Sequence, residues 1–137
     1  MTHLLPVTAA LFGAAVTAGL SVQPAGAVPG DVAVLQGLDK ITARISTFEA
    51  PLDVPVRFGS LEIVARVCDK KPPEETPEST AFLEIDDVRP DSPTIELFKG
   101  WMFASSPAVS ALEHPVYDVW VVDCKKASSS APETAPE

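Results

Sequence analysis

Three residues of the types that serve nucleophilic enzymes, Ser110, His114 and Asp118, stand four positions apart in the chain. On a continuous helix this spacing would place a nucleophile, a base and an orienting carboxylate on one face, as a hydrolase requires. However, Pro115 ends any helix after His114, and no Gly-x-Ser-x-Gly elbow surrounds the serine. The sequence therefore favours a capping or surface role for each residue and predicts no enzyme, with a hydrolase as the weaker alternative.

An acidic turn offers a second possible chemistry, because Asp86, Asp87 and Asp91 are the kind of oxygen ligands that Ca²⁺ prefers. The residue order of an EF-hand loop is missing, and Arg89 would compete for the carboxylates. Asp and Pro are also common turn residues for local backbone reasons. We therefore expect an ordinary turn here, and the sequence predicts no metal and no cofactor.

Aromatic residues gather near the C-terminal end, where large rings can serve either a core or an interface. A small domain needs bulk, which favours core positions for Phe103 and Trp120. Trp101, beside Gly100, is the better candidate for a partner contact, because we expect Gly100–Phe103 to follow a strand rather than to lie in one. The predicted partner-binding residues are Trp101, Met102, Phe103, His114 and Tyr117.

Cys68 and Cys124 are the two cysteines of the chain, and each ends an apolar run that is typical of a strand. In an exported protein their expected state is a disulfide, which would contribute about 4 kcal/mol by restricting the unfolded chain. A metal site with His114 and a redox-active thiol pair are weaker alternatives, because no Cys-x-x-Cys motif is present.

Residues 1–27 have the features of a cleaved export signal. They contain no Asp, Glu, Lys or Arg and end in Ala25-Gly26-Ala27, which fits the small-x-small pattern before a signal peptidase site. The apolar run Ala9–Val22 is too short for a membrane span, and the alternative of a buried N-terminal helix is less favoured. We expect cleavage after Ala27 and a periplasmic location.

Short runs of β-branched and aromatic residues recur between Pro, Gly and acidic turns, without a sustained helical period. The sequence predicts an all-β fold, a small antiparallel sandwich or barrel of about seven strands with one disulfide, over residues 28–124. The expected strands are Val32–Leu35, Ile41–Phe48, Val54–Phe58, Leu61–Cys68, Ala81–Asp86, Thr94–Lys99 and Val116–Cys124.

Alternation within these strands predicts which side chains face the core. The expected inward residues are Leu61, Ile63, Ala65 and Val67 in one strand, Ala81, Leu83 and Ile85 in the next, and Ile95 and Leu97 in a third.

Three segments are expected to depart from strand structure. The acidic stretch 72–78 is rich in proline and should form an irregular loop. Ser106–Leu112 is the one helix candidate, with Ser106 as cap and Pro107 at the first helical position. Residues 125–137 carry little apolar surface to bury, and we expect a disordered tail.

The formal net charge of −9 restricts the partners of the protein. An acidic chain is repelled by phosphate and by anionic lipid headgroups, which argues against nucleic-acid binding and against attachment to membranes through charge. The sequence contains no second long apolar run that would suggest a membrane span. We therefore expect a protein partner or a small molecule.

Four segments, Gly100–Pro107, Ala111–Trp120, Leu38–Arg44 and Arg57–Leu61, resemble an alphaproteobacterial exported family known as domain of unknown function 2155. The resemblance covers nearly all of the expected domain. It implies a periplasmic protein without an assigned activity, whose gene often lies beside that of an accessory subunit of respiratory complex I. Gene neighbourhood is an association rather than a physical argument.

These observations lead to the hypothesis of a periplasmic, non-enzymatic interaction module, an accessory or assembly subunit of an envelope complex such as respiratory complex I. The alternative is a periplasmic small-ligand or glycan-binding protein with a pocket lined by Trp101 and Tyr117.

Overall fold

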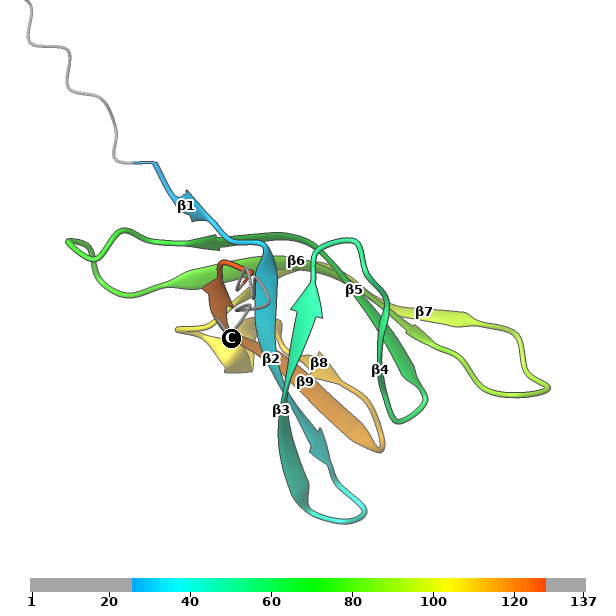
Figure 1. The fold of residues 1–137 in the computed structure, drawn as a ribbon. Helices are drawn as coiled ribbons and strands as arrows, with labels where there is room; N and C mark the ends of the chain where they lie inside the picture. The colour runs from blue at the N-terminus through cyan, green and yellow to red at the C-terminus, as the bar shows by residue number, and fades with distance from the viewer. Residues whose placement is uncertain (1–25, 128–137) are drawn as a thin grey trace, which may run out of the picture.

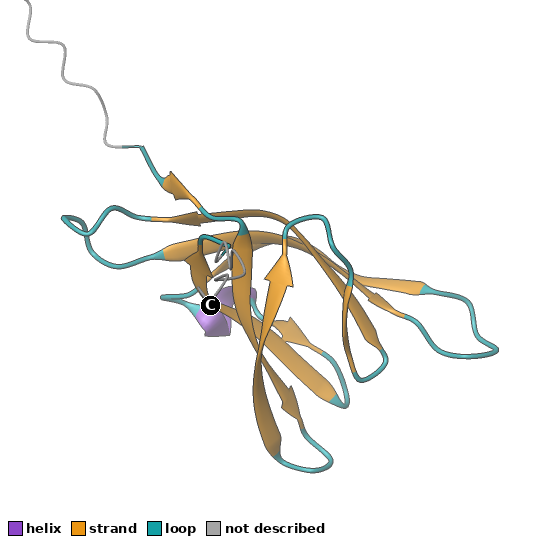
Figure 2. Ribbon diagram, viewed as in Figure 1, coloured by secondary structure: helices purple, strands orange, loops and turns teal. Residues whose placement is uncertain are grey.

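The computed structural model describes residues 26–127, and these form two antiparallel sheets that pack face to face (Figures 1 and 2). The first sheet has the order β1–β5–β6–β7, with β4 also paired to β5, and the second has the order β3–β2–β9–β8. The predicted all-β fold is confirmed, with two very short strands added. The strands are β1 (Val28–Pro29), β2 (Val32–Asp39), β3 (Arg44–Pro51), β4 (Val56–Phe58), β5 (Leu61–Lys70), β6 (Ser79–Asp87), β7 (Ile95–Phe103), β8 (Leu112–Glu113) and β9 (Tyr117–Lys125).

Strict alternation places the core between the two sheets. In β6 every second residue from Ser79 to Asp87 is buried, and the residues between them face outward. The inward positions predicted in β6 and in the first half of β5 are confirmed. The fully enclosed residues of the core are Ala33, Leu35, Ala50, Leu61, Ile63, Ala65, Ala81, Leu83, Ile85 and Val119.

The alternation predicted for Val67 is wrong, because β5 contains a β-bulge. The pairing of β5 with β6 shifts between Ala65 and Val67, so two consecutive residues of β5 oppose one position of β6. Val67 is consequently 37% exposed on the outer face, while Cys68 returns to the interior. Adding or removing one residue in a strand moves every side chain beyond that point to the opposite face of the sheet.

Ile95 faces the inner side of the first sheet, as predicted, but it is not buried there. The register between β6 and β7 shifts between Ile85 and Asp86, so Phe98 pairs with Ile85 and Ile95 pairs with the buried Asp87. Ile95 is nevertheless 57% exposed. Leu97 stays half-buried at the irregularity. Strand β7 also runs on to Phe103, so Gly100–Phe103 belongs to the strand rather than following it.

Several boundaries differ from those expected. Residues 41–43 form a turn, in which the amides of Ile41 and Thr42 donate to the carboxylate of Asp39, so β3 begins only at Arg44. The helix α1 is a single turn, Pro107–Ser110, with Pro107 at its start and no side-chain cap from Ser106. Strand β9 includes Lys125, one residue into the expected tail.

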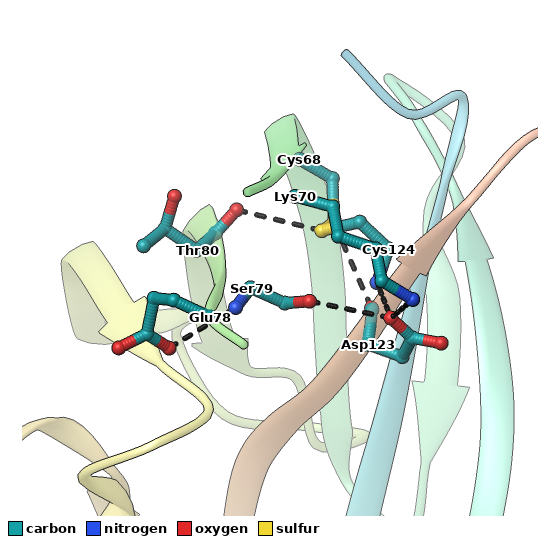
Figure 3. The surroundings of a disulfide bond; sticks show 7 residues. All are labelled: Cys68, Lys70, Glu78, Ser79, Thr80, Asp123 and Cys124. Atoms are coloured by element: carbon teal, nitrogen blue, oxygen red, sulfur yellow. Dashed lines mark hydrogen bonds and ion pairs between the residues drawn. A yellow bond between two sulfur atoms is a disulfide. The ribbon is translucent and has the colours of Figure 1, made fainter. Parts of the chain in front are cut away.

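The predicted disulfide joins the two sheets. Cys68 on β5 and Cys124 on β9 are bonded, with their Cα atoms 5.6 Å apart, and both side chains are buried (Figure 3). Asp123 lies beside the bridge and accepts hydrogen bonds from Lys70 Nζ at 2.8 Å, Ser79 Oγ at 3.2 Å and the Cys124 amide at 2.8 Å (Figure 3). Desolvation acts to raise the pKa of Asp123, but these donors together outweigh it and lower the pKa.

A column of rings fills the other end of the second sheet. Phe48 stacks on Phe58, Phe58 meets Tyr117 edge to face, and Tyr117 stacks on His114, with centroids 5.4 to 5.7 Å apart. Gly59, at a φ of 58°, makes room for this column, because a Cβ there would lie 2.3 Å from the Tyr117 ring. The column thus depends on a residue without a side chain at the turn between β4 and β5.

Two predictions fall mainly outside the described residues. The export signal covers residues 1–27, of which only Gly26 and Ala27 are described, and the tail beyond Ala127 is not described. Among residues 26–127, no helix has the length and apolar character needed to cross a membrane.

Candidate functional site

The outer face of the first sheet is the candidate site, because it carries large apolar side chains that the second sheet does not cover. Pairing places Val67 on β5 opposite Phe82 on β6, and Phe82 opposite Trp101 on β7. Phe103 lies two residues further along β7, opposite Thr80. We call this surface the aromatic face; its members are Val67, Phe82, Trp101 and Phe103.

The aromatic face is both exposed and ordered. Trp101 is 44% exposed and Phe103 41% exposed, although a small soluble domain usually buries such rings. The ring of Phe82 meets that of Trp101 edge to face, with centroids 5.5 Å apart and planes at 80°. Because β7 is the terminal strand of the first sheet, this row ends at an open sheet edge.

A network of charged residues borders the aromatic face. Arg66, from the bulge of β5, contacts Asp53 through one nitrogen at 2.9 Å and Glu84 on β6 through another at 2.9 Å. Lys99 on β7 contacts the second oxygen of Glu84 at 3.3 Å. The hydrogen bonds from Arg66, followed by that from Lys99, hold the pKa of Glu84 below its ordinary value against desolvation. These contacts keep the border of the face in one arrangement.

Beyond this network the same face becomes acidic. Glu62 on β5 pairs with Asp86 on β6, which pairs with Glu96 on β7, so three carboxylates form one row across the sheet. The outer face therefore changes from aromatic at one end, through the ion pairs of Arg66, to a row of carboxylates at the other, where Arg57 lies 3.6 Å from Glu62.

The structure separates the five predicted partner-binding residues. Trp101 and Phe103 face outward, but Met102 is 1% exposed, because adjacent residues of a strand point to opposite sides. His114 is 8% exposed and Tyr117 is half-buried in the ring column. The prediction of a core position for Phe103 is wrong, because Phe103 lies on the outward side of the same alternation. Trp120, for which a core position was also predicted, is half-buried.

The serine, histidine and aspartate at four-residue spacing do not form a catalytic group in the described residues. Ser110 Oγ accepts a hydrogen bond from the Phe103 amide, and Asp118 pairs with Lys40 at 2.7 Å. His114 Nδ1 accepts the Val116 amide at 3.1 Å. Each of the three side chains thus has a partner outside the predicted set.

His114 does face a carboxylate, but on another strand. Its Nε2 lies 3.7 Å from Oδ2 of Asp87, and the same oxygen contacts Arg89 at 2.7 Å. Asp86 and Asp87 point to opposite faces of β6, so they cannot share an ion. Within residues 26–127 no group of three or more His, Cys, Asp or Glu side chains is arranged to hold a metal.

Val67 and Phe82 are the members of the aromatic face that the sequence analysis did not identify. Each sits in a strand whose neighbours belong to the core, and only the pairing of β5, β6 and β7 brings them beside Trp101. The one available signal was the excess of apolar residues in Ala81–Ile85, where Phe82 occupies an outward position.

Comparison with known proteins agrees with the resemblance seen in the sequence. A family model described as "Uncharacterized protein conserved in bacteria (DUF2155)" matches residues 33–124, from β2 to the second cysteine of the disulfide. The "Uncharacterized protein RP359" of Rickettsia prowazekii (strain Madrid E) is 30% identical over 87 residues, which are 64% of this chain and 56% of that protein. The match thus spans little more than half of the relative's length. No solved structure shows a significant match. The chain belongs to the DUF2155 family.

Proposed function

We propose that this protein is a non-enzymatic interaction module of the periplasm that binds a protein partner through the aromatic face. The observation that carries the proposal is the row of exposed Val67, half-buried Phe82 and exposed Trp101 on the face of the first sheet that points away from the second sheet. Contiguous exposed apolar surface is unfavourable in water and marks interaction sites in soluble domains. Tryptophan in such a surface is a frequent source of binding energy.

The partner is a protein segment with apolar side chains and basic residues at one end. Apolar groups would cover Trp101 and Phe103, and basic groups would meet the acidic row that crosses the sheet at Glu62 and Asp86. The net charge of −9 supports this assignment, because it disfavours a second copy of the chain or another acidic protein.

The periplasmic location is supported by two features of the sequence. Residues 1–27 have the composition of an export signal, and a buried disulfide is stable in an oxidising compartment. Within the cell envelope, respiratory complex I is the candidate assembly, because the family resemblance implies a gene neighbourhood with an accessory subunit of that complex. The module would serve there as an accessory or assembly subunit.

Pull-down from crosslinked, gently solubilised envelope membranes tests the proposal. The variant Trp101→Ser with Phe103→Ser should lower recovery of the partner about tenfold or more, because two large exposed apolar side chains of the aromatic face are lost. Ile41→Ser with Ile45→Ser is the matched control, since both isoleucines are exposed on the hairpin of β2 and β3, Ile41 in its turn and Ile45 in β3. This control should change recovery by less than about twofold.

Three measurements accompany the pull-down. The thermal midpoint of each variant shows whether it still folds, and mass spectrometry identifies the recovered protein and the crosslinked peptides. Recovery should also fall as salt is added, because the acidic row contributes to binding. Crosslinks that avoid β7, equal losses in both double variants, or wild-type protein recovered only as a monomer would overturn the proposal.

The glycan-binding alternative loses its expected pocket. Trp101 lies on the outer face of the first sheet, whereas Tyr117 lies on β9 and packs against Phe58 and His114. The two rings therefore do not face a common ligand.

A further inference from the structure

A cavity of about 400 Å³ lies at the end of the molecule that contains the disulfide, and its lining shares no residue with the aromatic face. Its lining comes from β1, from the loop that follows β5 and from the end of β9. Strand β1 pairs with the end of β5 (Figure 1). We call it the lysine-rimmed pocket. Its apolar walls are formed by Val28, Pro29, Pro72, Pro73, Pro77 and Cys124.

The rim of this pocket is rich in lysine for so acidic a protein. The chain has 10 Lys and Arg against 19 Asp and Glu, yet four lysines and a single carboxylate, Glu75, line the cavity. Each lysine also contacts a carboxylate, so an anionic ligand gains binding energy here only where it can replace one of these ion pairs. The lysines are Lys70, Lys71, Lys125 and Lys126.

The lysines divide into a fixed pair and an available pair. Lys70 contacts Asp123 at 2.8 Å and Lys125 contacts Glu49, so both are held toward the protein. Lys71 contacts Glu75 only at 3.7 Å, with 49% of its side chain exposed. Lys126 contacts Asp31 only at 3.8 Å, with 62% exposed. Long, exposed ion pairs contribute little, so an incoming anion can replace these two.

The walls determine what the rest of the ligand must be. Proline has no amide hydrogen, so the four prolines present apolar ring surface and no backbone donor. A sugar would leave its hydroxyl groups without partners there, which costs binding energy. A flexible hydrocarbon chain needs no hydrogen bonds, and a cavity of this size lies within the range that accommodates small ligands.

We infer that the lysine-rimmed pocket binds a single-chain amphiphile with an anionic head group, the chain against the proline walls and the head between Lys71 and Lys126. This site is independent of the aromatic face and goes beyond the proposed interaction function. A medium-chain carboxylate is the simplest compound with these properties.

Isothermal titration calorimetry at low ionic strength tests the inference with decanoate below its micellar concentration. Decyl maltoside, which is neutral, and decyltrimethylammonium, which is cationic, have the same chain and serve as comparisons. Wild-type protein should bind decanoate at least about tenfold more tightly than either comparison compound, because only the carboxylate is attracted by the lysines.

Charge reversal locates the site. Lys71→Glu with Lys126→Glu should weaken decanoate binding about tenfold or more, because two nearby attractions become repulsions. Arg44→Glu with Arg57→Glu changes the net charge of the protein equally at positions outside the pocket and should change binding by less than about twofold.

Three outcomes would overturn the inference. Equal affinity for decanoate and decyl maltoside would remove the role of the lysines. Equal losses in the two double variants would assign the effect to net charge alone. Binding of a synthetic acidic peptide with the sequence of residues 128–137, without binding of decanoate, would assign the pocket to peptide. None of these results bears on the partner of the aromatic face.

Discussion

Gly59 occupies left-handed backbone space at the turn between β4 and β5, and the Tyr117 ring fills the position where a side chain would begin. The neighbouring column of rings can therefore close only around a residue without a Cβ. His114 belongs to this column, which explains why a residue that the sequence marked as reactive is buried among aromatic rings.

We expect Gly59→Ala to lower the free energy of unfolding by about 1–3 kcal/mol, because the new methyl adds backbone strain and displaces Tyr117. Urea denaturation followed by tryptophan fluorescence measures the change. Gly100→Ala is the control, since the atom nearest to its new Cβ would lie 3.6 Å away and its φ is not positive. A loss as large in Gly100→Ala would show that the close contact with Tyr117 is not the cause.

Trp101 and Met102 are adjacent in the sequence but differ completely in burial. One is among the most exposed rings and the other is among the most buried side chains, because β7 alternates between solvent and core. A cluster of apolar residues in a strand can therefore supply both the core and the surface. The alternation of the strand decides which residue lies on which side.

At the scale of elements, the bulge in β5 decides the position of the disulfide. The inward residues before the bulge are odd-numbered up to Ala65, and the next inward residue is Cys68. If the same residues alternated regularly, without a bulge, Cys68 would face solvent and Val67 the core. The same irregularity places Arg66 beside Asp53 and Glu84.

Deletion of Arg66 should leave the disulfide intact, because it removes the extra residue and restores simple alternation from Ala65 through Val67 to Cys68. Deletion of Val64, in the regular part of the strand, should prevent the bond. Every residue there is paired with β6, so the deletion shifts the alternation and turns Cys68 away from the core. Mass spectrometry of alkylated, unreduced protein counts the free thiols. Two free thiols in both deletion variants would contradict this account of the bulge.

At the scale of the whole molecule, one covalent bond joins the two sheets. The bridge closes the chain from β5 to β9 across a sequence separation of 56 residues and lies at one end of the core. The free energy that such a bridge contributes approaches the total stability of a small domain.

Replacement of both cysteines, Cys68→Ala with Cys124→Ala, should lower the free energy of unfolding by about 4 kcal/mol, because the unfolded chain regains the freedom that the loop removed. Urea denaturation in oxidising buffer provides the comparison. Addition of a reductant should destabilise the wild-type protein to a similar extent and leave the double variant unchanged. An unfolding midpoint insensitive to the double replacement would show that the sheets hold together without the bridge.

Local patterns accounted for much of this architecture. Alternation in Ala81–Ile85 and Leu61–Ala65 predicted the inner faces of β5 and β6 correctly, and two cysteines at strand ends predicted the bridge. These predictions succeeded because the direction of side chains in a regular strand depends only on adjacent residues.

The aromatic face and the lysine-rimmed pocket arise from contacts between distant residues. A bulge in β5 exposed Val67, pairing of β5, β6 and β7 placed Val67 and Phe82 beside Trp101, and packing enclosed Met102 and His114. The pocket needs β1, the loop after β5 and the end of β9 together. A bulge reverses which residues of a strand face the core, and it forms only against a partner strand. The register of pairing is likewise set between strands. The residues of a single segment therefore do not show where either occurs.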